Sequence, residues 1–298
     1  MSFYWPMLRT WRKDSDPSES SGSRIPTLWD EEVLSELQGL PPYDSKRHTT
    51  WYSRMCRNGT GPDEWDAASA EALHAYVTRC STNGFHPVYE LASHHNGLMN
   101  ILVSRRGDRL HMSATQLIPA RGWVMNSYSD TGVSDTFRDY GFVEPWPQLW
   151  WWSESQNSIG TKRSFFLFEH GEVVLEPMSY RTIDAARGFW RPATPLSRER
   201  HTGPLSREEL ESFQAAAEGL LARLPTSAGD DAAILERLSA EAARPQEAGP
   251  ASKRLRTSLL DRMSCVDYRM RFKRAVRKAL DKSAADLAAL QFEQCEAQ

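Results

Sequence analysis

Apolar residues recur at helical spacing in two segments before residue 85. The first begins at Thr27 with an acidic first turn and ends at Gly39, as in a capped amphipathic helix. Its apolar face consists of Val33, Leu34 and Leu37. The second spans residues 63–80 and stops before Asn83-Gly84. Its residues at helical spacing, which define the expected face, are Trp65, Ala68, Ala72, Ala75, Tyr76 and Arg79. The spacing therefore predicts two helices here.

Short strands replace this pattern further along the chain. The predicted strands are residues 101–104, 109–113, 123–128, 164–168 and 173–176. The turn Arg106-Gly107-Asp108 separates the first two strands, which predicts a β-hairpin. Gly171 lies between the last two strands and indicates a second antiparallel pair. We therefore expect a β-rich core in this part of the chain.

Beyond residue 200 the chain becomes helical again. Ser206 and Glu209 form a capping box ahead of an apolar stripe, which predicts a helix start. Asp230-Asp231 opens a second helix, because acidic side chains favour a first turn. A third and long helix is expected from about residue 254 to 291. The three apolar stripes consist of Leu210, Phe213, Ala217, Leu220, Leu221 and Leu224, then Ile234, Leu235 and Leu238, then Leu259, Met263, Val266, Met270, Val276 and Leu280.

Composition narrows the class of protein. The chain has 298 residues, 40% of them hydrophobic, and a net charge of -3, which fits an ordinary globular protein and excludes nucleic-acid binding through bulk charge. Four scattered cysteines without a C-x-x-C pair predict reduced thiols, so we expect an intracellular protein, in the cytoplasm, with the nucleus and plastid left open. We also expect the protein to be a monomer. No signal peptide or apolar run of membrane-spanning length is visible. Residues 1–27 are expected to be a flexible segment, because 13–27 are rich in serine and proline.

A series of motifs occupies the 60 residues from Phe85 to Glu144. In order, the motif residues are Pro87, Glu90, Ser93, His94, Gly122, Tyr128 and Tyr140-Gly141-Phe142. In type and interval the series resembles the carboxy-terminal half of the SET domain in the Rubisco large-subunit lysine methyltransferase and actin-histidine methyltransferase group. That group has Pro, Asp, Asn and His, then Gly and a catalytic Tyr, then Tyr-Gly-Phe. A match at several points is more specific than any one motif.

The resemblance implies a cofactor and a set of site residues. It implies S-adenosyl-L-methionine (AdoMet) as cofactor, a protein or peptide as substrate, and Tyr128 as the catalytic residue. The residues implied on the cofactor side are Arg79, Glu90, Ser93, His94, Tyr140 and Phe142. Methyl transfer from a sulfonium to a neutral nitrogen depends mainly on alignment, and a tyrosine hydroxyl can steer the methyl through weak C–H···O contacts. No metal is implied.

The resemblance also implies a fold and a division into domains. It implies an α+β protein, with an incomplete SET domain over residues 28–195 and an all-helical substrate-binding domain over 196–298. Within the first domain, a helical insert is expected over residues 28–84 and a β-rich core over 85–195. The Asn-His strand and the Tyr-Gly-Phe segment lie close together in the family, so the corresponding stretches are expected to meet in this chain.

Two departures from the family pattern bear on activity. Ser93 stands where the family has an asparagine, and a hydroxyl lacks the paired donor and acceptor of an amide. The Arg-Gly strand that opens the family's cofactor site is not recognisable before residue 28, since the Arg-Gly pairs lie at 106–107, 121–122 and 187–188. Two hypotheses follow. The chain is a SET-type protein N-methyltransferase acting on lysine or histidine, truncated at its start, or it is a catalytically inactive SET-like binding module.

Several other features have competing interpretations. Cys80, His86, His94 and His95 match no standard zinc spacing, and Glu90 is as suited to an ion pair with Arg79 as to cofactor contact. The chain has no Gly-x-Ser-x-Gly elbow of a hydrolase.

Two segments of unusual composition also leave alternatives. The tryptophans of segment 146–152 suit packing between the β region and the helical part, or an interaction surface. Residues 253–282 hold eleven basic and three acidic residues, and 206–247 hold four basic and nine acidic. These two segments either neutralise each other or leave a docking face for an acidic partner or, less favoured, nucleic acid.

Overall fold

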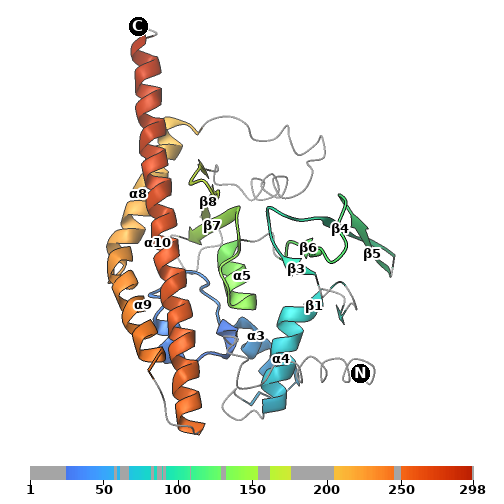
Figure 1. The fold of residues 1–298 in the computed structure, drawn as a ribbon. Coiled ribbons are helices and arrows are strands. Elements are labelled where there is room, and N and C mark those ends of the chain that lie inside the picture. Colours follow the sequence, from blue (N-terminus) through green and yellow to red (C-terminus); the bar gives the residue numbers. More distant parts are fainter. Residues whose placement is uncertain are drawn as a thin grey trace.

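The computed structural model describes residues 25–56, 59–60, 67–81, 84–85, 89, 92–107, 109–128, 132–153, 162–175, 205–244 and 250–296. Helices and strands are both present, as expected, and Figure 1 shows three long helices along one side with short strands beside them. The helices are η1 (Pro26–Leu28), α2 (Glu31–Ser35), α3 (Arg47–Cys56), α4 (Ala67–Arg79), α5 (Val133–Tyr140), α8 (Arg207–Arg223), α9 (Ala228–Ala242) and α10 (Pro250–Glu296). The strands are β1 (Cys80–Ser81), β2 (Gly84–Phe85), β3 (Ser93–His94), β4 (Ile101–Arg106), β5 (Arg109–Ala114), β6 (Met125–Asn126), β7 (Gln148–Ser153), β8 (Lys162–Leu167) and β9 (Val173–Leu175).

The three C-terminal helices follow their sequence signals closely. The Ser206 hydroxyl accepts a hydrogen bond from the Glu209 amide at 3.2 Å, and the Glu209 carboxylate accepts one from the Ser206 amide at 2.8 Å. The predicted capping box of α8 is therefore confirmed. Helix α9 begins at Ala228, earlier than predicted, because Ser227 forms a second capping box with Asp230. Helix α10 spans 47 residues and exceeds its predicted range at both ends.

Replacing Ser206 with alanine should lower the free energy of unfolding by about 1 kcal/mol, because the Glu209 amide at the start of α8 loses its hydrogen-bond partner. Urea unfolding followed by circular dichroism measures the change. Ser239→Ala is the matched control, since its hydroxyl bonds only to the Leu235 carbonyl one turn back within α9. The control should change stability by less than about 0.5 kcal/mol. Equal losses in both variants would show that the box contributes nothing specific.

A three-stranded antiparallel sheet, in the order β7-β8-β9, contacts α10 through β9 and α5 through β7. The tryptophan segment is strand β7, which pairs with β8 in a register that places Trp150 opposite Phe165. Trp150 is 1% exposed and its ring lies 5.6 Å from that of Phe272. Trp152 is fully buried and meets Phe213 of α8 at 5.5 Å. The interpretation of this segment as packing between the β region and the helices is confirmed.

The first predicted helix is divided into two short pieces. Trp29 is fully buried but has extended backbone, with ψ of 155° after η1, and this interrupts the helix before α2. Helix α2 ends at Ser35, before the expected Gly39, and Gln38 and Gly39 in the turn that follows both have positive φ values. Val33 and Leu37 are buried as expected. The prediction of one continuous helix was wrong because the burial of Trp29 outweighs helical continuity.

The predicted apolar face of α4 was also wrong. Among the side chains of this helix that the structure describes, Leu73 and Val77 are the buried apolar ones, and they pack with Ile25. Tyr76 is 41% exposed and stacks on Trp51 of α3 at 4.9 Å. The apolar residues of α4 thus serve two neighbours, and α3 is a helix that the sequence pattern did not reveal. The start of the predicted helix, residues 63–66, lies outside the described residues.

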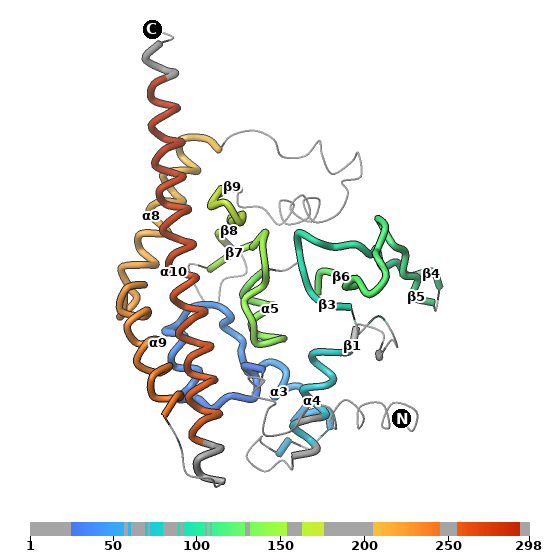
Figure 2. The backbone as a smooth tube through the Cα atoms, in the orientation of Figure 1, coloured from blue at the N-terminus to red at the C-terminus, as the bar shows by residue number. Residues whose placement is uncertain are grey.

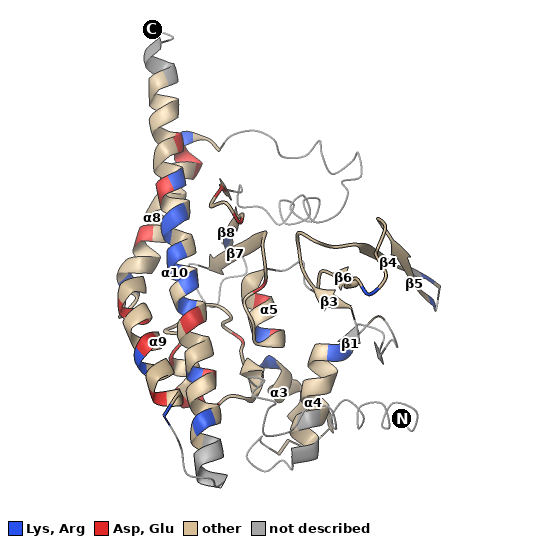
Figure 3. Cartoon of the chain, viewed as in Figure 1, with Lys and Arg blue, Asp and Glu red and all other residues tan. Residues whose placement is uncertain are grey.

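Charged residues of α9 and α10 meet in the interior, and Figure 3 marks the positions of acidic and basic residues along both helices. Asp231, which is fully buried, accepts hydrogen bonds from Arg269 at 2.9 Å and from Lys273 at 2.7 Å. Arg269 also bonds to Glu36, which follows α2. These pairs support the interpretation that the acidic and basic segments neutralise each other at these positions. None of the described helices has an apolar stretch long enough to cross a bilayer.

Candidate functional site

Two short parallel strands bring the motif segments together. In β3 and β6, Ser93 lies opposite Met125 and His94 opposite Asn126. The Ser93 amide donates to the Val124 carbonyl at 2.8 Å and the His95 amide to the Asn126 carbonyl at 3.0 Å. The strand predicted over 123–128 is therefore real but only two residues long. Figure 2 shows β3 and β6 side by side, between α5 and the β4–β5 hairpin.

Four aromatic side chains gather beside this strand pair, and we call them the ring cluster: His94, Tyr128, Tyr140 and Phe142. The His94 ring centre lies 5.1 Å from that of Tyr128 and 5.6 Å from that of Phe142. Tyr140 lies 4.9 Å from Tyr128 and 6.1 Å from Phe142. The expectation that the His94 strand meets the Tyr-Gly-Phe segment is confirmed.

His94 has a fixed orientation. Its Nδ1 atom accepts a hydrogen bond from the Tyr128 amide at 2.9 Å, so the neutral ring carries its proton on Nε2. Nε2 faces the Glu144 carboxylate, with Oε2 at 3.5 Å, and both side chains are at most 2% exposed. Within the described part of the chain, His94 Nε2 and Glu144 Oε1 have no hydrogen-bond partner. Glu144 therefore belongs to the site, although the sequence pattern did not single it out.

The two tyrosines of the ring cluster remain uncharged at neutral pH. Burial raises the pKa of Tyr128 above its usual value. Burial also raises the pKa of Tyr140, and the neighbouring Asp139 carboxylate adds to that rise. Arg79, at the end of α4, opposes the increase in both. The Tyr128 hydroxyl donates a hydrogen bond to the Ala92 carbonyl at 2.5 Å.

The three other predicted site residues have different outcomes. Ser93 is half-buried in β3. Glu90 lies outside the described residues, as does Pro87, so the suggested pair between Glu90 and Arg79 stays a prediction. Arg79 lies at the end of α4, and its positive charge acts on the ring cluster by opposing the rise in the pKa of Tyr128 and Tyr140.

Amide side chains that sequence reasoning missed hold the crossing segments in place. Asn96 is 2% exposed; its amide donates to the Pro147 carbonyl at 2.9 Å and its oxygen accepts from the Ser127 hydroxyl at 2.9 Å. Asn126 donates to the Tyr89 hydroxyl at 3.0 Å. The only available signal was the position of Asn96, two residues after His94. These hydrogen bonds join neighbouring segments of the protein around the site.

Helix α5, which the sequence did not predict, carries Tyr140 at its end. An ion network fixes this helix: Arg138 bonds to Asp139 at 2.6 Å and to Asp44 at 3.1 Å, and His48 lies 2.8 Å from Asp139. Burial opposes ionisation of Asp139, but the hydrogen bonds from His48 and Arg138 prevail and lower its pKa to about 2. The network joins α5 to the α3 region and thereby positions Tyr140.

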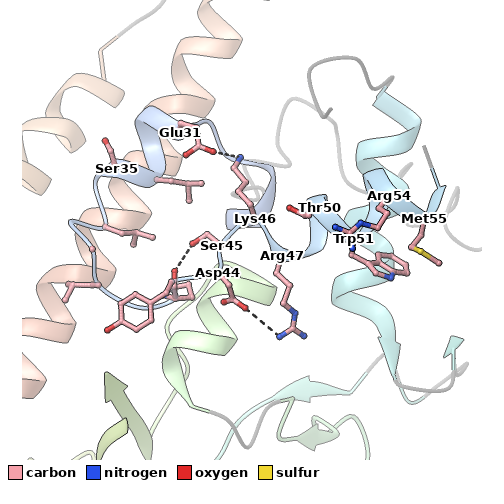
Figure 4. Close-up of a pocket in the computed structure, with 16 residues that line it drawn as sticks. Glu31, Ser35, Asp44, Ser45, Lys46, Arg47, Thr50, Trp51, Arg54 and Met55 are labelled. Atoms are coloured by element: carbon pink, nitrogen blue, oxygen red, sulfur yellow. Dashed lines mark hydrogen bonds and ion pairs between the residues drawn. The ribbon is translucent and has the colours of Figure 1, made fainter. Parts of the chain in front are cut away.

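A separate pocket of about 740 Å³ lies between α2 and α3. Figure 4 shows Trp51, Arg54 and Met55 at one side of it, with Lys46 paired to Glu31 at 3.9 Å. No member of the ring cluster lines this pocket. In the described residues, no three His, Cys, Asp or Glu side chains gather in a way that would hold a metal ion.

Comparison with known proteins gives a limited result. No family model matches the chain, and no curated protein matches it. Among solved structures, the chain is similar to Rubisco LSMT bound to sinefungin and monomethyllysine, with a TM-score of 0.46, 15% identity, and coverage of 97% of this chain and 75% of that chain. For Rubisco LSMT bound to AdoMet, the TM-score is 0.45 and the identity 14%, with coverage of 96% of this chain and 76% of that chain. For the SET domain of LSMT bound to lysine and AdoHcy, the TM-score is 0.43 and the identity 15%, with coverage of 94% of this chain and 75% of that chain. At this level of similarity, any functional proposal depends on the side chains of the site itself.

Proposed function

We propose that the protein is an AdoMet-dependent protein N-methyltransferase of the SET type, acting on lysine. One observation carries the proposal: His94, Tyr128 and Phe142 come from segments far apart in the chain, yet their rings lie within one cluster. The motif resemblance requires this convergence, and a chance similarity of short motifs does not. The incomplete SET domain and the helical substrate-binding domain belong to the same proposal.

The ring cluster suits the reactive end of the proposed cofactor. AdoMet, when bound, supplies a methyl group on a cationic sulfur. Aromatic faces attract cations, and Phe142 remains 36% exposed, so the cluster is not sealed. Neutral Tyr128 and Tyr140 offer hydroxyl oxygens to orient the accepting nitrogen. Glu144 faces His94 Nε2 across 3.5 Å, and His94 Nδ1 accepts a hydrogen bond from the Tyr128 amide.

A second candidate is a SET-like module that binds a protein or peptide without catalysis. Two observations favour it. The Tyr128 hydroxyl is already bonded to the Ala92 carbonyl, and Ser93 offers a single hydroxyl in place of an amide. On this alternative, the ring cluster is a structural remnant and the chain keeps only its docking surfaces.

Calorimetric titration with S-adenosylhomocysteine separates the two candidates. Saturable heat is expected if the chain is an enzyme. Removing the hydroxyl in Tyr128→Phe should change the affinity for S-adenosylhomocysteine by no more than about twofold. The rate of methylation of proteins in a cell extract should fall at least about 100-fold. The two readouts distinguish a role in the reaction from a role in binding.

Tyr76→Phe is the matched control, because Tyr76 is a partly exposed tyrosine outside the ring cluster. It should retain both binding and transfer. Absence of heat at millimolar S-adenosylhomocysteine would contradict the enzyme and leave the binding module. Methyl transfer that survives in Tyr128→Phe would remove this tyrosine from the reaction.

A further inference from the structure

The β4–β5 hairpin is a two-stranded sheet that projects from the body. Its pairs run from Ile101 opposite Ala114 to Arg106 opposite Arg109, and Figures 1 and 2 show it on the side of the molecule away from α10. A two-stranded hairpin alone is only marginally stable in water. An additional strand would therefore stabilise this part of the protein.

The register of the hairpin shows which edge is open. Arg106 and Arg109 flank a two-residue turn and form a hydrogen-bonded pair. Because such pairs alternate along antiparallel strands, Leu110 and Met112 direct their backbone groups outward. The start of β4 lies beside β6, where the Asn100 amide donates to the Met125 carbonyl at 3.1 Å. No described residue pairs with the outward groups of β5, so β5 is an open edge within the part of the chain that the structure describes.

The two faces of β5 differ in chemistry. Leu110 and Met112 are half-buried on one face, whereas Arg109 and His111 are exposed on the other. Arg106 lies opposite Arg109 and shares its face. Neither of these arginines has an ion pair with a described residue, and Figure 3 shows basic residues at the hairpin tip. A complementary strand would therefore alternate apolar with acidic side chains.

We propose that β5 is a docking edge for an extended segment of another polypeptide, in which apolar residues alternate with Asp or Glu. The segment's backbone would pair with the outward groups of Leu110 and Met112, as in recognition by strand addition. Its apolar side chains would lie beside these two residues, and its carboxylates beside Arg109 and His111. A second copy of the chain fits less well, because its own β5 is cationic on the same face. The proposal is independent of methyl transfer.

Two blocked eight-residue peptides test the proposal, one alternating Val with Glu and the other Val with Lys. Fluorescence anisotropy with the full chain should show binding of the Glu peptide and at least about tenfold weaker binding of the Lys peptide. Met112→Pro removes one outward amide, which an edge strand tolerates, and should weaken the Glu peptide about fivefold. Arg109→Glu should reverse the preference between the peptides.

Val103→Pro is the matched control. Val103 lies opposite Met112, so its replacement removes an outward amide from β4, at the other edge of the hairpin. It should keep affinity within about twofold. Hydrogen exchange at the inward amides of His111 and Ser113 shows whether the hairpin remains folded in each proline variant. If a proline variant unfolds the hairpin, the peptide preference of Arg109→Glu alone tests the proposal. Equal affinity for both peptides, or no binding of either, would overturn the proposal. So would sedimentation showing a dimer that Met112→Pro dissociates.

Discussion

Asp231→Ala is expected to lower the free energy of unfolding by about 3–5 kcal/mol, since it leaves the buried Lys273 without its carboxylate partner and Arg269 with Glu36 alone. Asp231 is fully buried and bonds to Arg269 and Lys273, whose side chains are 1% and 3% exposed. Burial already lowers the pKa of Lys273, and the Asp231 carboxylate opposes that decrease. Without this carboxylate, the lysine must lose its proton or remain charged in the interior. Urea unfolding followed by circular dichroism measures the loss.

Asp267→Ala provides the control on α10, the helix that carries Arg269 and Lys273. Asp267 pairs with Arg271 one turn away, and these side chains are 30% and 50% exposed. The removal of such an exposed pair should cost less than about 0.5 kcal/mol. If both variants lose the same small amount, the junction between α9, α10 and the α2 turn does not depend on its buried charges.

Trp150→Ala should destabilise the protein by about 3–5 kcal/mol, because the lost ring leaves a cavity that its neighbours cannot fill. Trp150 is 1% exposed, and its ring lies 6.0 Å from Tyr268 and 5.6 Å from Phe272. Circular dichroism is the suitable probe, since the chain has 11 tryptophans and their fluorescence reports many places at once.

Trp123→Ala removes the same side chain from an exposed position, where Trp123 is 72% exposed. The expected change is within about 0.5 kcal/mol. A loss in Trp123→Ala as large as that in Trp150→Ala would contradict the view that β7 joins the strands to the C-terminal helices.

Local signals made part of the fold predictable. The Ser206 capping box lies within four consecutive residues and needs no distant partner, so the sequence was sufficient. The hairpin turn at Gly107 is also local, and its φ of 64° suits glycine. Strand β7 was harder to recognise, because both of its faces are buried and no apolar–polar alternation marks it.

Elements that depend on distant partners could not be predicted. Helix α5 begins at Val133, and Gly132 before it provides no side-chain cap. The stability of α5 depends on contacts such as those of Phe137 with Trp29 and Tyr268. The amphipathic period of its eight residues is too short to stand out. Tertiary packing therefore decides this helix.

The ring cluster was predictable only as a whole. Single residues such as Tyr128 give no signal, but the order of motifs predicted that His94 and Phe142 would approach each other. Glu144, Asn96 and Tyr89 were missed because their roles depend on which buried polar atoms face them. Such pairings follow from three-dimensional arrangement and leave no pattern in the chain.

The bond between Glu36 and Arg269 spans 233 residues of sequence. During translation, at roughly 5–20 residues per second, the ribosome would need about 10–50 s to reach the arginine after completing the glutamate. Throughout that interval, apolar residues such as Val33 and Leu37 remain uncovered, because α10, which packs against them in the folded protein, has not yet been synthesised. Newly made chains should therefore depend on chaperones until α10 emerges, and loss of this last helix should expose the earliest part of the protein to proteolysis.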